Sequence, residues 1–319
     1  MNNIDILVSE VGPRDGLQNI SSIMPTAAKE RWIRAEAGAG VREIEVGSFV
    51  PAKLFPQLAD TAEVVEIAGN IEGLTVAVLV PNLRGAEDAV RAGADKISIP
   101  FSVSATHLKR NLNRTHAEML DEVQQIAEML QGIPDSERPF FEGGLATAFG
   151  CTLEGRVDEA KVAQFAEQLI AAGCDEVGLS DTTGYANPAQ VRRLVRSVRN
   201  TVGEDKLTGV HLHNTRGLGL ANALAAIEEG ITTIDSSLGG LGGCPAAPGA
   251  SGNIVTEDLV FMLESMGLNT GIDIEKLLNV RQILLEVIPD EQLYGFTPDA
   301  GLPKGFDKGF DKGFAHVGT

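Results

Sequence analysis

Two histidines and one aspartate have the types and the spacing to hold a metal ion. His211 and His213 are two positions apart in a run that reads as a β-strand, so both rings lie on one side of the sheet. Asp15 follows the first strand-like run of the chain, within Arg-Asp-Gly. Two imidazoles and a carboxylate suit Mg²⁺, Mn²⁺, Co²⁺ or Zn²⁺, and the ligand types alone do not choose among these ions. An isolated inward histidine is more often a hydrogen-bonded core residue, but a pair near a strand-end aspartate favours a metal site.

Short β-rich runs that alternate with amphipathic segments must position these residues. The strand-like runs are Asp5–Gly12, Arg42–Phe49, Leu74–Pro81, Lys96–Val103, Pro139–Phe149, Glu176–Thr183, Leu207–Asn214 and Thr232–Gly239. Eight βα units in about 250 residues match a (β/α)8 TIM barrel, whereas a doubly wound sheet needs fewer strands and a topological switch point. We therefore predict an α/β fold with one barrel domain over residues 1–290, whose short C-terminal extension is an outer helix at Ile274–Ile288.

Polar residues gather at the expected C-terminal ends of the strands, where TIM-barrel enzymes carry their catalytic side chains. Besides the three metal-ligand candidates, the strand-end candidates are Arg14, Gln18, Glu45, Ser48, Asp181 and Thr182. We expect an active site at this end of the barrel.

A glycine-rich segment, Gly239–Asn253, follows the eighth strand-like run. It lacks the Lys-Ser/Thr of a phosphate-binding P-loop, so we interpret it as a lid with glycine hinges. Cys244 lies in its middle, where closure would bring a thiol over the metal site. The alternative is an ordinary surface loop with an unreactive cysteine.

Composition excludes several classes of function. The chain has 26 Lys and Arg against 44 Asp and Glu, a formal charge of −18, which opposes binding to nucleic acid or to an anionic membrane. The start, MNNIDILVSE, does not resemble a signal peptide, and no run approaches the roughly 18 apolar residues of a membrane helix. Three cysteines match neither a disulfide framework nor a CxxC metal site, so we expect a cytoplasmic protein. Residues 291–319, which include the repeated KGFD, read as a flexible Gly/Lys/Phe-rich tail.

Taken in order, these motifs resemble those of the hydroxymethylglutaryl-CoA lyase family, metal-dependent lyases related to Claisen-type condensing enzymes that share a TIM barrel. The resemblance runs from about Ile4 to about Leu278. It is carried by Val11–Asn19, Glu45 with Ser48–Val50, His211-x-His213, Gly242–Pro245, Gly249–Asn253 and Glu257–Leu259. Leu17 stands where the condensing enzymes usually have Glu, which points to the lyase branch.

The resemblance implies a site and an activity. It adds Asn253 to Asp15, His211 and His213 as a metal ligand, and we expect the ion to be Mg²⁺ or Mn²⁺. It gives catalytic importance to Arg14, Glu45 and Cys244. The implied reaction is metal-dependent cleavage of 3-hydroxy-3-methylglutaryl-CoA to acetoacetate and acetyl-CoA, the chemistry of leucine degradation and ketone-body formation, in a homodimer that binds an acyl-CoA substrate.

Some positions near the expected pocket depart from the family pattern. Asn214-Thr-Arg216 stands in place of Asp-Thr-Tyr, Gly47-Ser48 in place of paired threonines, and Ala146-Thr147 in place of Ser-Cys. The same chemistry on another 3-hydroxyacyl-CoA is therefore one alternative. Arg216 is a candidate for holding a distal carboxylate, although a solvated surface charge is the other interpretation.

For the cleavage step, we expect Arg14 to stabilise the enolate oxygen, Glu45 to orient Arg14, and the Cys244 thiol to protonate the enolate carbon. The residues leave the base open among Asp15, His211 and a metal-bound water. Lys109, Arg110 and Arg114 are candidates for contacting the CoA phosphates, or else form the solvated face of a helix. Two further alternatives are a condensing acyltransferase, against which the short region after the family match argues, and a catalytically silent interaction module.

Overall fold

Eight parallel strands close into one barrel in the computed structural model, which describes residues 4–242 and 252–306. The strands are β1 Leu7–Glu10, β2 Glu43–Ser48, β3 Thr75–Leu79, β4 Lys96–Ser102, β5 Phe140–Ala146, β6 Glu176–Ser180, β7 Gly209–His211 and β8 Thr233–Ser236. Each strand pairs with its neighbours in sequence, and β8 pairs with β1. The predicted TIM barrel is confirmed, with each strand shorter than the run that predicted it.

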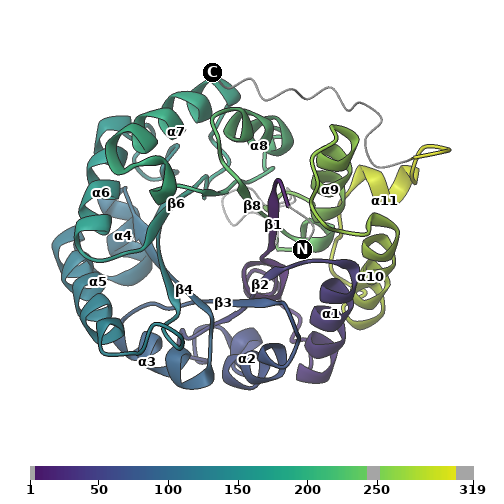
Figure 1. Ribbon diagram of the computed structural model, residues 1–319, viewed down its shortest axis with the longest axis horizontal. Coiled ribbons are helices and arrows are strands. Elements are labelled where there is room, and N and C mark those ends of the chain that lie inside the picture. The colour runs from purple at the N-terminus through teal and green to yellow at the C-terminus, as the bar shows by residue number, and fades with distance from the viewer. Residues whose placement is uncertain (1–3, 243–251, 307–319) are drawn as a thin grey trace.

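Helices surround the barrel (Figure 1). They are α1 Thr26–Ala39, α2 Thr61–Gly69, α3 Leu83–Ala92, α4 Ala105–Leu112, α5 His116–Gln131, α6 Glu159–Ala171, α7 Pro188–Val202, α8 Gly219–Glu228, α9 Thr256–Ser265, α10 Ile274–Val287 and α11 Phe296–Ala300. Of these, α10 and α11 form an outer layer that packs on α1 and α9. Side-chain caps fix several starts: Asp158, Asn187 and Asp273 each accept a hydrogen bond from the first turn of the helix that follows. None of these described helices combines the length and apolarity that crossing a bilayer requires.

The inside of the barrel is lined by small and charged residues instead of the bulky branched side chains common in this fold. Gly144, Gly178 and Gly209 line a cavity along the axis. A Cβ on Gly178 would lie 2.5 Å from Oε1 of Glu142, so glycine makes room for that carboxylate. Glu142 in turn pairs with the Lys96 ammonium at 2.7 Å. These small residues leave space below the C-terminal mouth.

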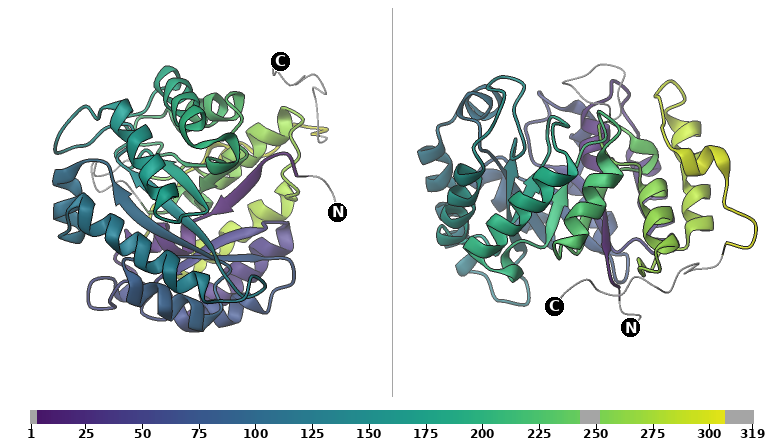
Figure 2. Two further views of the ribbon diagram at one scale, coloured as in Figure 1. Left: turned by 60° about the vertical axis from the view of Figure 1, so that its left-hand side comes forward. Right: turned by 90° about the horizontal axis from the view of Figure 1, so that it is seen from above.

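The C-terminal segment packs against the barrel as an outer layer (Figure 2). The Tyr294 N–H donates to the carbonyl of Gly239 at 2.6 Å, and the Phe296 and Thr297 N–H groups donate to the Asp258 carboxylate. The Phe306 ring stacks on Phe261. A flexible tail was expected to begin at residue 291. The segment as far as Phe306 is instead packed, because its backbone groups find partners on α9 and after β8. Residues 307–319, with most of the KGFD repeat, lie outside the described part.

Candidate metal centre

Asp15 is placed by a tight π-helical turn, η1 Gly12–Gly16, directly after β1. The N–H groups of Arg14 and Asp15 both donate to the carbonyl of Val11, at 3.1 and 2.7 Å. The buried carboxylate of Glu10 accepts the N–H of Gly12 at 2.8 Å and fixes the start of the turn. This turn brings two consecutive side chains, Arg14 and Asp15, to the wall of the barrel cavity.

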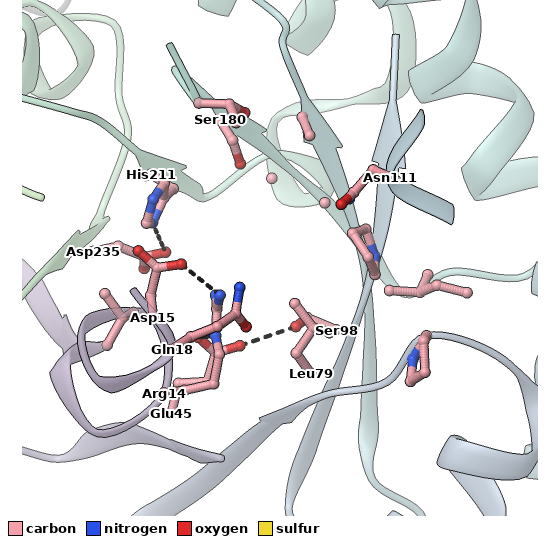
Figure 3. Close-up of a pocket in the computed structure, with 18 of the residues that line it drawn as sticks. Arg14, Asp15, Gln18, Glu45, Leu79, Ser98, Asn111, Ser180, His211 and Asp235 are labelled. Carbon is pink, nitrogen blue, oxygen red and sulfur yellow. Dashed lines mark hydrogen bonds and ion pairs between the residues drawn. The ribbon is translucent and has the colours of Figure 1, made fainter. Parts of the chain in front are cut away.

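His211, the last residue of β7, faces Asp15 (Figure 3), and His213 follows two residues later in the chain. Nε2 of His211 lies 3.0 Å from Nε2 of His213. One potential ligand atom from each of Asp15, His211 and His213 lies within 4.8 Å of the other two. The structure therefore brings together the three residues that strand periodicity predicted as ligands.

Asn253 joins this group from the end of the glycine-rich segment. Its Nδ2 donates to Oδ2 of Asp15 at 2.8 Å, and His213 pairs with Asn253 through a β-bridge. Oδ1 of Asn253 is buried and has no hydrogen-bond partner among the described residues. A buried, unpartnered oxygen beside two facing imidazole nitrogens and a carboxylate fits a divalent cation, since this donor set resembles those of known Mn²⁺ and Mg²⁺ sites.

The two ends of the glycine-rich segment are tied together, which explains how Asn253 reaches Asp15. The N–H of Ser237 donates to the carbonyl of Ile254 at 2.9 Å. Gly242 has φ +97°, and a Cβ there would lie 2.6 Å from the Cα of Gly16. The close approach of this segment to η1 thus requires glycine. Cys244, the expected proton donor, lies outside the described residues.

The surrounding charges and burial keep Asp15 ionised and His213 neutral, which are the forms of these two ligands that bind cations. Burial raises the pKa of Asp15, but Arg14 and the histidines outweigh it and hold that pKa well below the usual range. Burial and the neighbouring His211 lower the pKa of His213 to about 3. For His211, burial lowers the pKa, while a hydrogen bond with Asp235 and the charge of Asp15 raise it above the ordinary value. An ionised carboxylate and a neutral imidazole are therefore available together near pH 7.

Arg14 is held by two carboxylates. Its Nε donates to Oε2 of Glu45 at 2.5 Å, and its Nη1 donates to Oδ1 of Asp15 at 2.6 Å. Ser98 donates to the other oxygen of Glu45 at 3.3 Å. Burial lowers the pKa of Arg14, but the charges of Glu45 and Asp15 outweigh burial and raise this pKa above its ordinary value. The guanidinium therefore stays charged. Glu45 thus contacts Arg14 and not the histidines, as its expected orienting role requires.

The expected substrate-binding residues separate into two groups. Gln18 and Thr182 line a cavity of about 940 Å³ that also contains Arg14, Asp15 and both histidines. Ser48, Asp181 and Arg216 are not among its described lining residues.

The three outlying residues have backbone partners instead. The Asp181 carboxylate accepts the N–H groups of Tyr185 and Ala186, and the Arg216 guanidinium donates to the carbonyls of Thr183 and Gly184. The Ser48 hydroxyl accepts the N–H of Val50. These polar groups thus bind loops around the mouth, and their role as substrate contacts stays a prediction.

Asp235 was missed by sequence reasoning. Its Oδ2 lies 3.1 Å from Nδ1 of His211, and its side chain borders the cavity. The available signal was its position in the eighth strand-like run, because β8 neighbours β7 and residue 235 is level with residue 211.

Comparison with known proteins places these residues in a family. The sequence matches the HMGL-like family over residues 5–284. It is 40% identical to the mitochondrial hydroxymethylglutaryl-CoA lyase of Mus musculus over 283 residues, 89% of this chain and 86% of that protein. The cytoplasmic 3-hydroxy-3-methylglutaryl-CoA lyase of Rattus norvegicus is 39% identical, over 89% of this chain and 81% of its own.

Solved structures agree with the sequence comparison. An HMG-CoA lyase from Acinetobacter baumannii, in complex with coenzyme A and 3-methylmalate, superposes with a TM-score of 0.88 at 40% identity, covering 96% of this chain and 99% of that chain. The HMG-CoA lyase of Bacillus subtilis gives 0.87 at 37% identity, with 93% and 98% covered.

Proposed function

Because this chain belongs to the HMGL-like family, we propose that it is a divalent-metal-dependent carbon–carbon lyase that cleaves 3-hydroxy-3-methylglutaryl-CoA to acetoacetate and acetyl-CoA. The observation that carries the proposal is the cluster of Asp15, His211, His213 and Asn253 beside a charged Arg14 at one cavity. The names of the similar lyases support the same substrate. The resemblance also leads us to propose Cys244 as the proton donor to the enolate carbon, and a homodimer.

The chemistry assigns distinct tasks to the residues. Retro-Claisen cleavage removes the hydroxyl proton, breaks the adjacent carbon–carbon bond and leaves the thioester as an enolate. A divalent ion held by the four ligands would acidify the hydroxyl that it contacts. Arg14 would donate to the enolate oxygen, because its fork is fixed by Glu45 and Asp15 and stays charged.

The pKa of Asp15 and the contacts of His211 bear on the choice of base. The low pKa of Asp15 makes its carboxylate a poor proton acceptor. Nδ1 of His211 faces Asp235 and its Nε2 faces His213, so its two nitrogens already have partners. We therefore propose water at the site, the third expected acceptor, as the group that takes the hydroxyl proton.

A substrate panel tests the proposed activity. Protein with Mn²⁺ or Mg²⁺ is incubated with 3-hydroxy-3-methylglutaryl-CoA, with homologues that carry longer 3-alkyl groups, and with other 3-hydroxyacyl-CoAs. We expect acetyl-CoA release from the methyl compound, its loss on adding EDTA, and recovery with excess metal, because the metal site is part of the reaction. If no member of the panel is cleaved in an EDTA-sensitive reaction, the proposed lyase activity is refuted. Preference for another member moves the assignment to that acyl group, and condensation without cleavage favours the acyltransferase alternative.

Two arginines at the cavity are suited to the phosphates of CoA. Arg110 and Arg114 line the cavity at the end of α4 and just beyond it, and both are exposed. Arg114 also lies 3.5 Å from the Glu122 carboxylate. Lys109 is not among the described lining residues and donates to the carbonyl of Asn113. We propose that the arginines, and not the lysine, contact the anionic end of the substrate.

The Arg110→Ala/Arg114→Ala double variant is expected to raise KM for the acyl-CoA by about 10- to 100-fold, since a hydrogen bond to a charged group contributes roughly 1.5–3 kcal/mol before solvent screening reduces it. We expect kcat to change little, because these contacts are the same in the ground and transition states. Steady-state kinetics measure both constants, with Lys109→Ala as the matched control. A KM equal to that of the wild type shows that the phosphates bind elsewhere.

A further inference from the structure

Asp235 on β8 contacts a residue of the metal centre without belonging to the centre itself. Its Oδ2 lies 3.1 Å from Nδ1 of His211 (Figure 3), while the other ring nitrogen, Nε2, is the one that lies beside His213. In the register of the barrel, His211 and Asp235 are direct partners across the β7–β8 pair. Residues level with each other on neighbouring strands point to the same side, so the barrel itself fixes this contact.

We propose that Asp235 is a positioning residue that prepares His211 to bind a metal ion. A carboxylate accepts a hydrogen bond only from a protonated ring nitrogen, so contact with Asp235 places the proton on Nδ1. Nε2 of His211 then keeps its lone pair and faces His213 and Asp15. The same contact fixes the rotation of the ring. This inference rests on the proposed metal site.

The two histidines differ in how they are held. Nδ1 of His213 is buried and has no hydrogen-bond partner among the described residues. His213 is instead placed by its β-bridge with Asn253 and by burial. Of these two rings, His211 is the one whose proton position is set by a carboxylate. Loss of Asp235 is therefore expected to affect His211 and to leave His213 as it is.

The surroundings of Asp235 argue against two other roles. It is not part of the group whose ligand atoms lie within 4.8 Å of one another, which speaks against direct ligation. Its side chain is 28% exposed, lines the cavity and contacts His211 through one carboxylate oxygen, whereas a purely structural aspartate would be enclosed by backbone donors, as Asp181 is. The geometry thus fits an outer carboxylate that supports a ligand.

Mn²⁺ affinity tests the proposal without using catalysis. Metal-stripped wild type, Asp235→Ala and Asp235→Asn are titrated with Mn²⁺ in a calorimeter, after thermal melting has shown that each is folded. We expect Asp235→Ala to bind Mn²⁺ about 10- to 100-fold more weakly, the usual cost of losing an outer partner of a ligating histidine. Asp235→Asn keeps an oxygen that can accept from Nδ1–H, so we expect a smaller loss. Glu43→Gln is the matched control, because Glu43 lines the same cavity and contacts Lys96 and not a ligand.

A second measurement examines the proton itself. In the metal-free wild type, at a pH above the raised pKa of His211 where the ring is neutral, ¹⁵N spectra of the histidine rings are expected to show His211 with its proton on Nδ1. In Asp235→Ala the same ring is expected to show a mixture of the two tautomers, with His213 unchanged. A merely structural role of Asp235 would lower the melting temperature without moving this signal.

Two results would overturn the role of Asp235, and a third would overturn the metal site on which that role depends. Folded Asp235→Ala with wild-type Mn²⁺ affinity shows that Asp235 does not position His211. An equal loss of affinity in Glu43→Gln shows that only cavity charge matters. If the wild type itself binds no Mn²⁺, the metal site fails, and the role of Asp235 fails with it.

Discussion

The Asp15→Ala variant, stripped of metal and titrated with Mn²⁺, is expected to bind the ion more than about 100-fold more weakly than the wild type. This loss exceeds the usual cost, about 10- to 100-fold, of removing a residue that only supports a ligand. With Mn²⁺ supplied, the variant is expected to lose lyase activity in parallel. The aspartate supplies the proposed negatively charged ligand of the site. Its carboxylate also accepts from Asn253 at 2.8 Å and from Arg14 at 2.6 Å. Alanine therefore removes one ligand. It also removes the acceptor that holds a second ligand, Asn253, and the catalytic guanidinium of Arg14 in place.

Asp15→Asn separates charge from shape. The amide has the size of the carboxylate, but its NH₂ must face at least one of two donors, the Asn253 amide and the Arg14 guanidinium. We expect it to bind Mn²⁺ nearly as poorly as the alanine variant, by calorimetry or by the EPR signal of free Mn²⁺. Asn19→Ala is the control, since the Asn19 side chain donates to the backbone carbonyl of Asp15 and not to its carboxylate. Wild-type affinity in folded Asp15→Ala contradicts the ligand assignment.

The site residues that could be predicted from the sequence are those whose positions follow the alternation of a strand. His211 and His213 are two residues apart in one strand-like run, and Glu45 lies in the second run near the same mouth of the barrel. Alternation along a strand and the order of the strands were therefore sufficient to predict these three residues. The fold was predictable for the same reason, because eight βα units repeat a local pattern that the closed barrel preserves.

Other parts depend on contacts that no local pattern encodes. Asn253 reaches Asp15 because Ser237 bonds Ile254 across a long loop, and only the family motif pointed to it. A strand-end position also does not reveal whether a polar side chain faces the cavity or caps its own loop. Asp181 and Arg216 illustrate this, since both bind backbone groups near Gly184 and are not among the described lining residues of the cavity.

Arg14→Lys is expected to lower kcat by about 100- to 1,000-fold, the cost seen when a preorganised donor to a developing oxyanion is removed. Lysine keeps the positive charge beside Asp15. It cannot, however, donate at once to Glu45 and to Asp15 in the fixed directions that the guanidinium uses. The ammonium is then free to rotate, and its donor is no longer aimed at the place where the enolate oxygen forms.

The kinetic pattern distinguishes this role from metal binding. Because Asp15 stays paired with a cation in Arg14→Lys, we expect Mn²⁺ affinity to stay close to that of the wild type while kcat falls and KM changes little. Arg216→Lys is the matched control, because Arg216 lies near the same mouth but binds the carbonyls of Thr183 and Gly184 and stacks on Tyr185. Parallel losses of Mn²⁺ affinity and kcat in Arg14→Lys would show that Arg14 acts through Asp15. A retained kcat would show that the charge alone suffices, so that the two hydrogen bonds orienting the guanidinium contribute nothing to the reaction.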